Sequence, residues 1–200
     1  MTAQTATAYN METEGEGMSD FNLGDIPDLS GVTEQEQAPF EKGWYAGTIL
    51  GQRSFTDRNG NDRLFESTDT PSVAGDSRNI RLQVEVKRAS DGRVMNISAL
   101  VNYRPEDLSA DTVSAVLAHK EKVAAGEEWG PMFRPFATLQ RLGKLQKIAG
   151  VRQLGRNGNG GLDLHPLYNK AGYFKLEQDD RNPQYMKIAD FRETKPKQVL

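Results

Sequence analysis

Residues 79–103 read NIRLQVEVKRASDGRVMNISALVNY, and the predicted architecture follows from this stretch. Apolar and polar residues alternate strictly in its first half, which places four aliphatic side chains on one face: Ile80, Leu82, Val84 and Val86. Residues 94–103 alternate in the same way after the Asp-Gly turn that ends at Gly92. Because a period of two is typical of half-buried strands, the two runs predict an antiparallel β-hairpin.

Another predicted strand precedes this hairpin. The stretch WYAGTILGQR at 44–53 is rich in β-forming residues, and Gly47 and Gly51 indicate a strongly bent strand. The polar sequence TDRNGND at 56–62 carries an Asn-Gly turn signal. Residues 66–77 are expected to form a long exposed loop.

Helices and a further hairpin are predicted downstream. Ser109 is a typical N-cap for a helix that ends near Ala125, before Gly126. A second helix is predicted over residues 136–149, where apolar residues recur at helical spacing before Gly150. The final hairpin is expected from two strands, Ala171–Leu176 and Tyr185–Phe191, joined by a turn around residues 179–183.

The resulting order is three strands, a helical insertion and two strands. This β-β-β-α-β-β order is that of a five-stranded OB-type barrel, in which a helix between the third and fourth strands plugs one end. We therefore expect a mainly β fold with a helical insertion. A β-meander with helices packed on one side has the same strand count and stays open as an alternative.

Charge divides the chain into two parts. Residues 1–38 contain eight of the 28 acidic residues and no Lys or Arg, whereas residues 39–200 carry 25 basic against 20 acidic residues. The first part lacks periodicity and is predicted to be a disordered acidic tail, with Phe21, Leu23, Ile26 and Leu29 as a short docking segment. We expect the OB-like domain to occupy residues 39–193 and residues 194–200 to be flexible.

Several classes of protein are disfavoured by composition. The chain has no cysteine, which excludes disulfides, thiolate metal sites and cysteine nucleophiles. Residues 1–30 lack a basic segment followed by an apolar one, as a secretory signal would have, and no apolar run approaches about 20 residues. A cytoplasmic protein is therefore expected, with no metal or cofactor and no enzymatic activity.

The outward faces of the predicted strands carry basic residues and tyrosines together, and the loop after the first strand adds further arginines and a phenylalanine. Lys and Arg neutralise phosphates, and aromatic rings stack on bases of any sequence, so this combination favours single-stranded DNA binding. Each position by itself is more simply explained as an ordinary solvated or half-buried side chain, so the prediction depends on the recurrence of basic residue and ring together on several strands. The candidate binding residues are Arg53, Phe55, Arg58, Arg63, Arg81, Lys87, Tyr173, Lys175, Tyr185 and Lys187.

Five stretches carry a resemblance to a known family: FEKGWYAGTIL at 40–50, GDSRNIRLQVEVK at 75–87 with VNYRPED at 101–107, and LDLHPLYNKAGYFKL at 162–176 followed by NPQYMKIADF. They resemble the small OB-fold single-stranded DNA-binding proteins of tailed bacteriophages. The resemblance implies protection of single-stranded DNA in the host cytoplasm during phage replication or recombination, with phage replication or recombination proteins as partners. It carries over no catalytic residue. The acidic tail here is N-terminal, whereas bacterial-type single-strand binders usually carry it at the C-terminus.

Two other functions remain open. Glu85 and Lys87 form a Glu-x-Lys pair with Asp76 nine residues earlier, which is the arrangement of magnesium-dependent nucleases of the PD-(D/E)xK type. The signal is weak because Glu-x-Lys occurs by chance on polar strands and no Pro-Asp pair precedes it. A phage structural or regulatory OB-like module that binds protein instead of DNA is the other alternative, and it would expose an apolar patch.

Overall fold

The hairpin predicted from residues 79–103 lies at the centre of the sheet. In the computed structural model, which describes residues 39–57 and 59–200, β5 (Arg78–Lys87) and β6 (Val94–Tyr103) pair antiparallel along their whole length. The register runs from Arg78 opposite Tyr103 to Lys87 opposite Val94. The predicted disordered tail, residues 1–38, and the candidate residue Arg58 lie outside the described residues.

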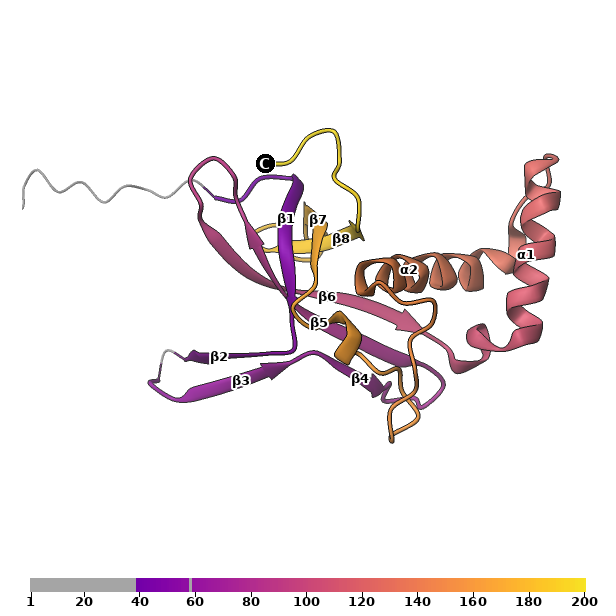
Figure 1. Cartoon of the computed structure of the whole chain (residues 1–200), viewed down its shortest axis with the longest axis horizontal. Helices are drawn as coiled ribbons and strands as arrows, with labels where there is room; N and C mark the ends of the chain where they lie inside the picture. The colour runs from indigo at the N-terminus through magenta and orange to yellow at the C-terminus, as the bar shows by residue number, and fades with distance from the viewer. Residues whose placement is uncertain (1–38, 58) are drawn as a thin grey trace, which may run out of the picture. The chain divides into compact units, whose positions relative to one another are not determined.

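Three further strands extend the sheet from the other edge of β5 (Figure 1). β1 (Gly43–Leu50) pairs with the second half of β5 on one side and with β7 (Ala171–Gln178) on the other. β8 (Met186–Arg192) pairs with β7, with a bulge between Lys175 and Leu176. The five strands predicted from the sequence are thus arranged in the order β6-β5-β1-β7-β8.

The segment between β1 and β5 differs from the prediction. It contains three strands, β2 (Gln52–Thr56), β3 (Asp62–Glu66) and β4 (Thr68–Pro71), so the described residues hold eight strands instead of five. β2 and β3 form a separate hairpin whose turn includes Gly60 at φ 79°, as the Asn-Gly signal indicates. β4 pairs with the first half of β5, where β1 no longer runs beside it. These strands are short and polar, and therefore carry no alternating apolar pattern.

The core lies on the inner face of the sheet. It includes Tyr45 and Ile49 of β1, the four aliphatic residues of β5, and Phe174 and Leu176 of β7, all essentially inaccessible to solvent. β1 and β5 approach closely at Gly47, since a Cβ atom there would lie 2.6 Å from the carbonyl oxygen of Glu85. A glycine at this position therefore permits the tight pairing of β1 with β5.

Both predicted helices form. Ser109 is the N-cap of α1 (Ala110–Ala124), where its side chain accepts a hydrogen bond from the backbone N–H of Thr112. α2 (Phe133–Ala149) begins three residues before the predicted start and ends at Gly150, which is left-handed with φ 73°. Short 3₁₀ turns lie at Pro105–Leu108, Gly130–Met132 and His165–Leu167.

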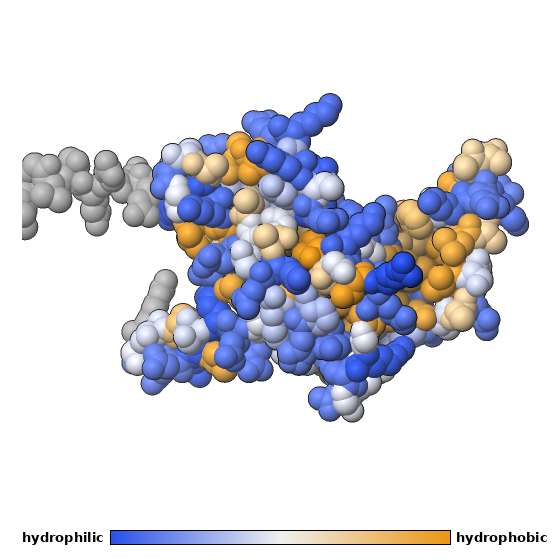
Figure 2. All heavy atoms as spheres, in the orientation of Figure 1, coloured by the Kyte–Doolittle hydropathy of each residue, from blue (hydrophilic) through white to orange (hydrophobic). Residues whose placement is uncertain are grey.

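The two helices are packed differently. α2 contacts β6 and β8 and buries Leu142, Leu145 and Ile148 against the core. α1 buries only Val116 and stands away from the sheet (Figure 1). Leu117 of α1 and Phe133 at the start of α2 are exposed, and Figure 2 shows hydrophobic surface along α1. The helical insertion therefore consists of α2, which is packed on the core, and α1, an arm with few core contacts.

The sheet is not closed into a barrel. β6 and β8 approach each other, but no hydrogen-bonded pairing joins them in the part of the chain that the structure describes. The mainly β fold with a helical insertion is confirmed, whereas the predicted barrel is not closed.

The folded unit extends past the predicted boundary at residue 193. The backbone N–H of Leu200 donates to the carbonyl of Trp44 at 2.8 Å, and the side chain of Leu200 packs against the core. The carbonyl of Leu200 accepts from the N–H of Ala89 at 3.1 Å. Residues 39–200 therefore form one folded unit. No helix among the described residues has the length and apolar character needed to cross a membrane.

Candidate nucleic-acid interface

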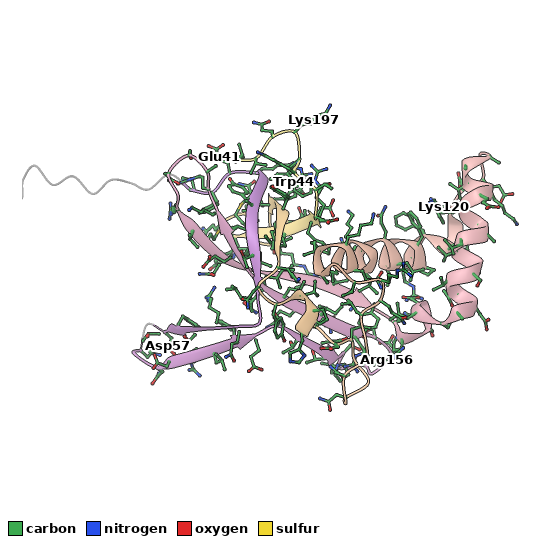
Figure 3. The ribbon with its side chains drawn as sticks, viewed as in Figure 1. Glu41, Trp44, Asp57, Lys120, Arg156 and Lys197 are labelled. Carbon is green, nitrogen blue, oxygen red and sulfur yellow. The ribbon has the colours of Figure 1, made fainter. Side chains whose placement is uncertain are left out.

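The β2–β3 hairpin presents one face of aromatic and cationic side chains. The rings of Phe55 and Phe65 stack with their centroids 4.9 Å apart and their planes 4° from parallel. The guanidinium carbon of Arg53 lies 5.6 Å and 5.8 Å from the same two centroids. Arg63 is opposite Phe55 in the register and therefore shares this face. Its Nε donates to Asp57 Oδ2 at 3.0 Å, near the hairpin tip marked by Asp57 in Figure 3.

The hairpin projects from the body of the folded unit (Figure 1), where Phe55 is half-buried and Phe65 is exposed. Phe65 is 39% exposed, and the opposite face of the same strand carries Leu64 at 56%. Phe65 is absent from the residues predicted from the sequence, although its alternation with Arg63 in DRLFE was the available signal. A stacked, solvent-accessible ring pair beside guanidinium groups can stack on bases and hold phosphates.

The base of the hairpin is fixed to the main sheet. The hydroxyl of Ser67 donates to the carbonyl of Leu50 at 2.6 Å and accepts from the backbone N–H of Gln83 at 2.9 Å. Gln83 is buried, although it lies on the polar face of the alternating pattern of β5. Asp69 in β4 forms a buried ion pair with Arg78 of β5 at 2.9 Å. These contacts hold the hairpin by its base and leave its tip free of the core.

A second group of candidate residues lies on the outer face of the main sheet. Ala46 of β1 is paired with Lys87 of β5 on one side and with Tyr173 of β7 on the other. Neighbouring strands are about 4.8 Å apart, so the backbones of Lys87 and Tyr173, one on each side of Ala46, are separated by roughly twice that distance. Ala46 and Lys87 are exposed and Tyr173 is half-buried. Because the Ala46 side chain is small, the surface between Lys87 and the ring of Tyr173 is uncovered.

Two residues that the sequence analysis missed continue this face. Trp44 is paired with Lys175, and Arg192 is paired with Tyr173. The guanidinium carbon of Arg192 lies 4.2 Å from the centroid of the Trp44 ring, which is a close cation–π contact. Trp44 could have been found from its alternation with the buried Tyr45. Arg192 had no local signal, because only the pairing of β7 with β8 brings it beside Tyr173.

The remaining predicted lysines have carboxylate partners. Lys175 Nζ lies 2.7 Å from Glu177, and this hydrogen bond lowers the pKa of Glu177. Lys187 pairs with Asp180, which raises the pKa of Lys187 and lowers that of Asp180. Phosphates would compete with these carboxylates for the two ammonium groups.

The ten predicted residues do not form one cluster. Arg53, Phe55 and Arg63 belong to the hairpin that follows the Leu50 end of β1. The opposite end, where Gly43 pairs with Leu176, lies beside the turn that precedes β8. Tyr185 is in this turn and is 64% exposed, and Arg81 is exposed near the β4 end of β5. Eight strand residues span about 25 Å, so the surface extends along the length of β1.

The residues of the nuclease hypothesis are not brought together. Glu85 and Lys87 share the outer face of β5, whereas Asp76 precedes the other end of that strand and lies 3.8 Å from Arg104. Among residues 39–57 and 59–200, no group of three His, Asp or Glu side chains could hold a metal ion.

The candidate interface therefore consists of the aromatic–cationic face of the hairpin and the outer face of β1, β5 and β7. Comparison of the sequence with models of known protein families and with curated proteins gives no match.

Proposed function

We propose that this protein binds single-stranded DNA without sequence preference and does not act as an enzyme. The observation that carries the proposal is the stacked pair of the half-buried Phe55 ring and the exposed Phe65 ring beside Arg53 on a projecting hairpin. Bases in a single strand have free faces that can stack on such rings, whereas bases in a duplex are already stacked on each other. The lysine and tyrosine of the outer sheet face provide a second contact region.

We also propose that the sheet is an open OB-type barrel. The spatial order β6-β5-β1-β7-β8, the position of α2 between β6 and β7 in the chain, and the approach of β6 to β8 support this assignment. In this arrangement, the β2–β3 hairpin occupies the connection between the first and second barrel strands. OB folds bind oligonucleotides with the face of their second and third strands and with this connection.

Sequence independence follows from the kind of contact available. Stacking contributes roughly 1–3 kcal/mol per base whatever the base, and Lys and Arg recognise phosphates that every nucleotide carries. The resemblance to phage single-strand binders supports a role in protecting single strands during phage replication or recombination, in the host cytoplasm and with replication or recombination proteins as partners.

Fluorescence anisotropy with labelled oligo-dT, duplex DNA and RNA at two salt concentrations tests the proposal. We expect oligo-dT to bind more tightly than duplex, with an affinity that falls steeply as salt increases. Equal weak binding to oligo-dT and duplex, or no binding at low salt, would contradict single-strand binding. Capture of a protein partner through the exposed arm of α1, without DNA binding, would instead favour the protein-binding module.

A further inference from the structure

A hollow beside Trp44 is lined by cations and uncharged residues, without an acidic side chain. Its volume is about 410 Å³, and its walls are formed by Trp44, Arg192, Lys195, Pro196, Lys197 and Gln198. Three of these six residues are positively charged and none is acidic. Trp44 and Lys197 are labelled in Figure 3, where both lie at the end of the sheet that includes the start of β1. The hollow lies at the opposite end of β1 from the hairpin.

Arg192 in this hollow lacks an anionic partner. Its guanidinium is held over the Trp44 ring at 4.2 Å, and its Nε is buried without a hydrogen-bond partner. Within the described part of the chain, no carboxylate lies within ion-pair distance of Arg192, although eleven other ion pairs form there. A buried donor on a charged group is costly unless a partner satisfies it. Because no carboxylate of the described residues neutralises its charge, Arg192 makes the hollow complementary to an anion.

The wall that carries the two lysines is held in place. Pro196 is buried, and Leu200 is tied to Trp44 and Ala89 by backbone hydrogen bonds. The side chain of Leu200 also fills the space over Gly43, where a Cβ atom would lie only 2.3 Å from its Cδ1. Lys195 and Lys197 are exposed on this wall, and no ion pair within residues 39–57 and 59–200 involves either of them. Their ammonium groups are thus available to the same anion as Arg192.

We infer that the Trp44–Arg192 hollow binds a phosphate group. The planar guanidinium matches two phosphate oxygens, and two ammonium groups beside it add compact charges without geometric demands. The ring of Trp44 keeps the guanidinium in place. The inference rests on the proposed function and deepens it, because the phosphate belongs to a bound DNA strand anchored at the Gly43 end of β1.

The two tryptophans of the chain allow a direct test, since Trp129→Phe leaves Trp44 as the single fluorescent indole. In this background, we would titrate inorganic phosphate, oligo-dT with a 5′-phosphate and the same oligo-dT without it. Saturable changes in Trp44 fluorescence are expected with phosphate and with oligo-dT. A response to both oligonucleotides indicates a backbone phosphate, whereas a response only to the phosphorylated one indicates a terminal phosphate.

Matched variants show whether the response comes from this site. Lys195→Ala with Lys197→Ala should weaken phosphate binding about tenfold, whereas Lys120→Ala with Lys122→Ala, an equally spaced exposed pair on α1, should leave it unchanged. Arg192→Lys keeps the positive charge but loses the planar pair of guanidinium donors, so it should also weaken phosphate binding. The melting temperature of this variant is the check on its folding.

Equal phosphate affinity in both lysine double variants overturns the site. If oligo-dT binds by anisotropy but Trp44 does not respond, the phosphate site fails and the proposed function stands. If phosphate binds here but oligo-dT does not, the proposed function fails and the hollow remains a site for free phosphate groups.

Discussion

The hydroxyl of Tyr103 donates a 2.6 Å hydrogen bond to Oδ2 of Asp69, and both side chains are buried. The same carboxylate oxygen accepts the backbone N–H of Leu162 at 2.6 Å, while Oδ1 accepts from Arg78. Burial raises the pKa of Tyr103, and the hydrogen bond to Asp69 raises it further, so the hydroxyl stays protonated as a donor. Asp69 therefore joins β4 to β5, β6 and the segment that precedes β7.

Replacing Asp69 by Asn should destabilise the fold strongly. The change leaves Arg78 as a buried charge without its partner, which typically costs about 3–5 kcal/mol of unfolding free energy. Tyr103→Phe should cost less, roughly 1.5–3 kcal/mol, because only one hydrogen bond to a charged group is lost. Urea denaturation measures both. Asp62→Asn on exposed β3 is the control, and similar stability of the Asp69 and Asp62 variants would show that the buried network contributes nothing.

Removing either hairpin ring should weaken binding to oligo-dT. Phe55→Ala or Phe65→Ala is expected to lower the affinity about 5- to 150-fold, the range that corresponds to 1–3 kcal/mol of stacking. Leu64→Ala is the matched control, since Leu64 lies on the same strand but on the other face. Phe65→Tyr should retain most of the affinity because it keeps a ring. Equal affinities of the Phe65→Ala and Leu64→Ala variants would show that the aromatic face does not contact DNA.

Lys87→Ala should change the salt dependence of binding. Lys87 is exposed beside Ala46 on the outer face of the sheet, where it can neutralise one phosphate. Loss of one phosphate contact on a single strand is expected to reduce the slope of log K against log salt by roughly 0.7. Anisotropy at several salt concentrations measures the slope. Lys120→Ala on α1 is the control, and an identical slope in the two variants would place Lys87 outside the DNA path.

Deleting residues 1–38 should raise the affinity for single-stranded DNA at low salt. Eight carboxylates tethered to a basic domain act at an effective concentration of about millimolar and can occupy phosphate-binding Lys and Arg. The gain should be greatest near about 50 mM salt and should shrink as salt screens both interactions. Anisotropy with the full chain and with a chain beginning at Pro39 makes the comparison. An unchanged affinity at every salt concentration would mean that the acidic segment does not compete, and a much lower melting temperature would mean that it contributes to folding.

The turn between β5 and β6 should lose a stabilising contact in acid. Hydrogen bonds from Arg88 and from the backbone N–H of Arg93 lower the pKa of Asp91 to about 2. Because the folded pKa is below the unfolded one, the stabilisation is present above about pH 4 and is lost as the pH falls toward 2. The difference in stability between the wild type and Asp91→Asn should therefore narrow over this interval. Titration of the Asp91 carboxyl carbon by NMR near pH 4 would contradict the effect.

Local sequence signals were sufficient for much of the secondary structure. The alternation in residues 79–103 predicts β5, β6 and their pairing, because both strands and the turn are contiguous in the chain. Ser109 and Gly150 predict helix ends, since capping depends on residues within one turn. Arg53, Phe55 and Arg63, which the sequence placed together as candidates, share one face of the β2–β3 hairpin. Phe65 was missed because its own strand, β3, has only five residues, and the alternation of Arg63 with Phe65 is too short to stand out as a strand pattern.

By itself, the sequence determined where β1, β5, β6, β7, β8 and the two helices form, which face of β5 is buried, and where acidic and basic residues are concentrated along the chain. These properties depend on neighbours a few positions apart. Only the tertiary structure decided that β1 lies between β5 and β7, that the barrel-like sheet stays open between β6 and β8, and that Arg192 lies over Trp44. Strand pairing between distant segments depends on how whole faces pack against one core. No local sequence pattern around Trp44 or Arg192 encodes the contact between these two residues.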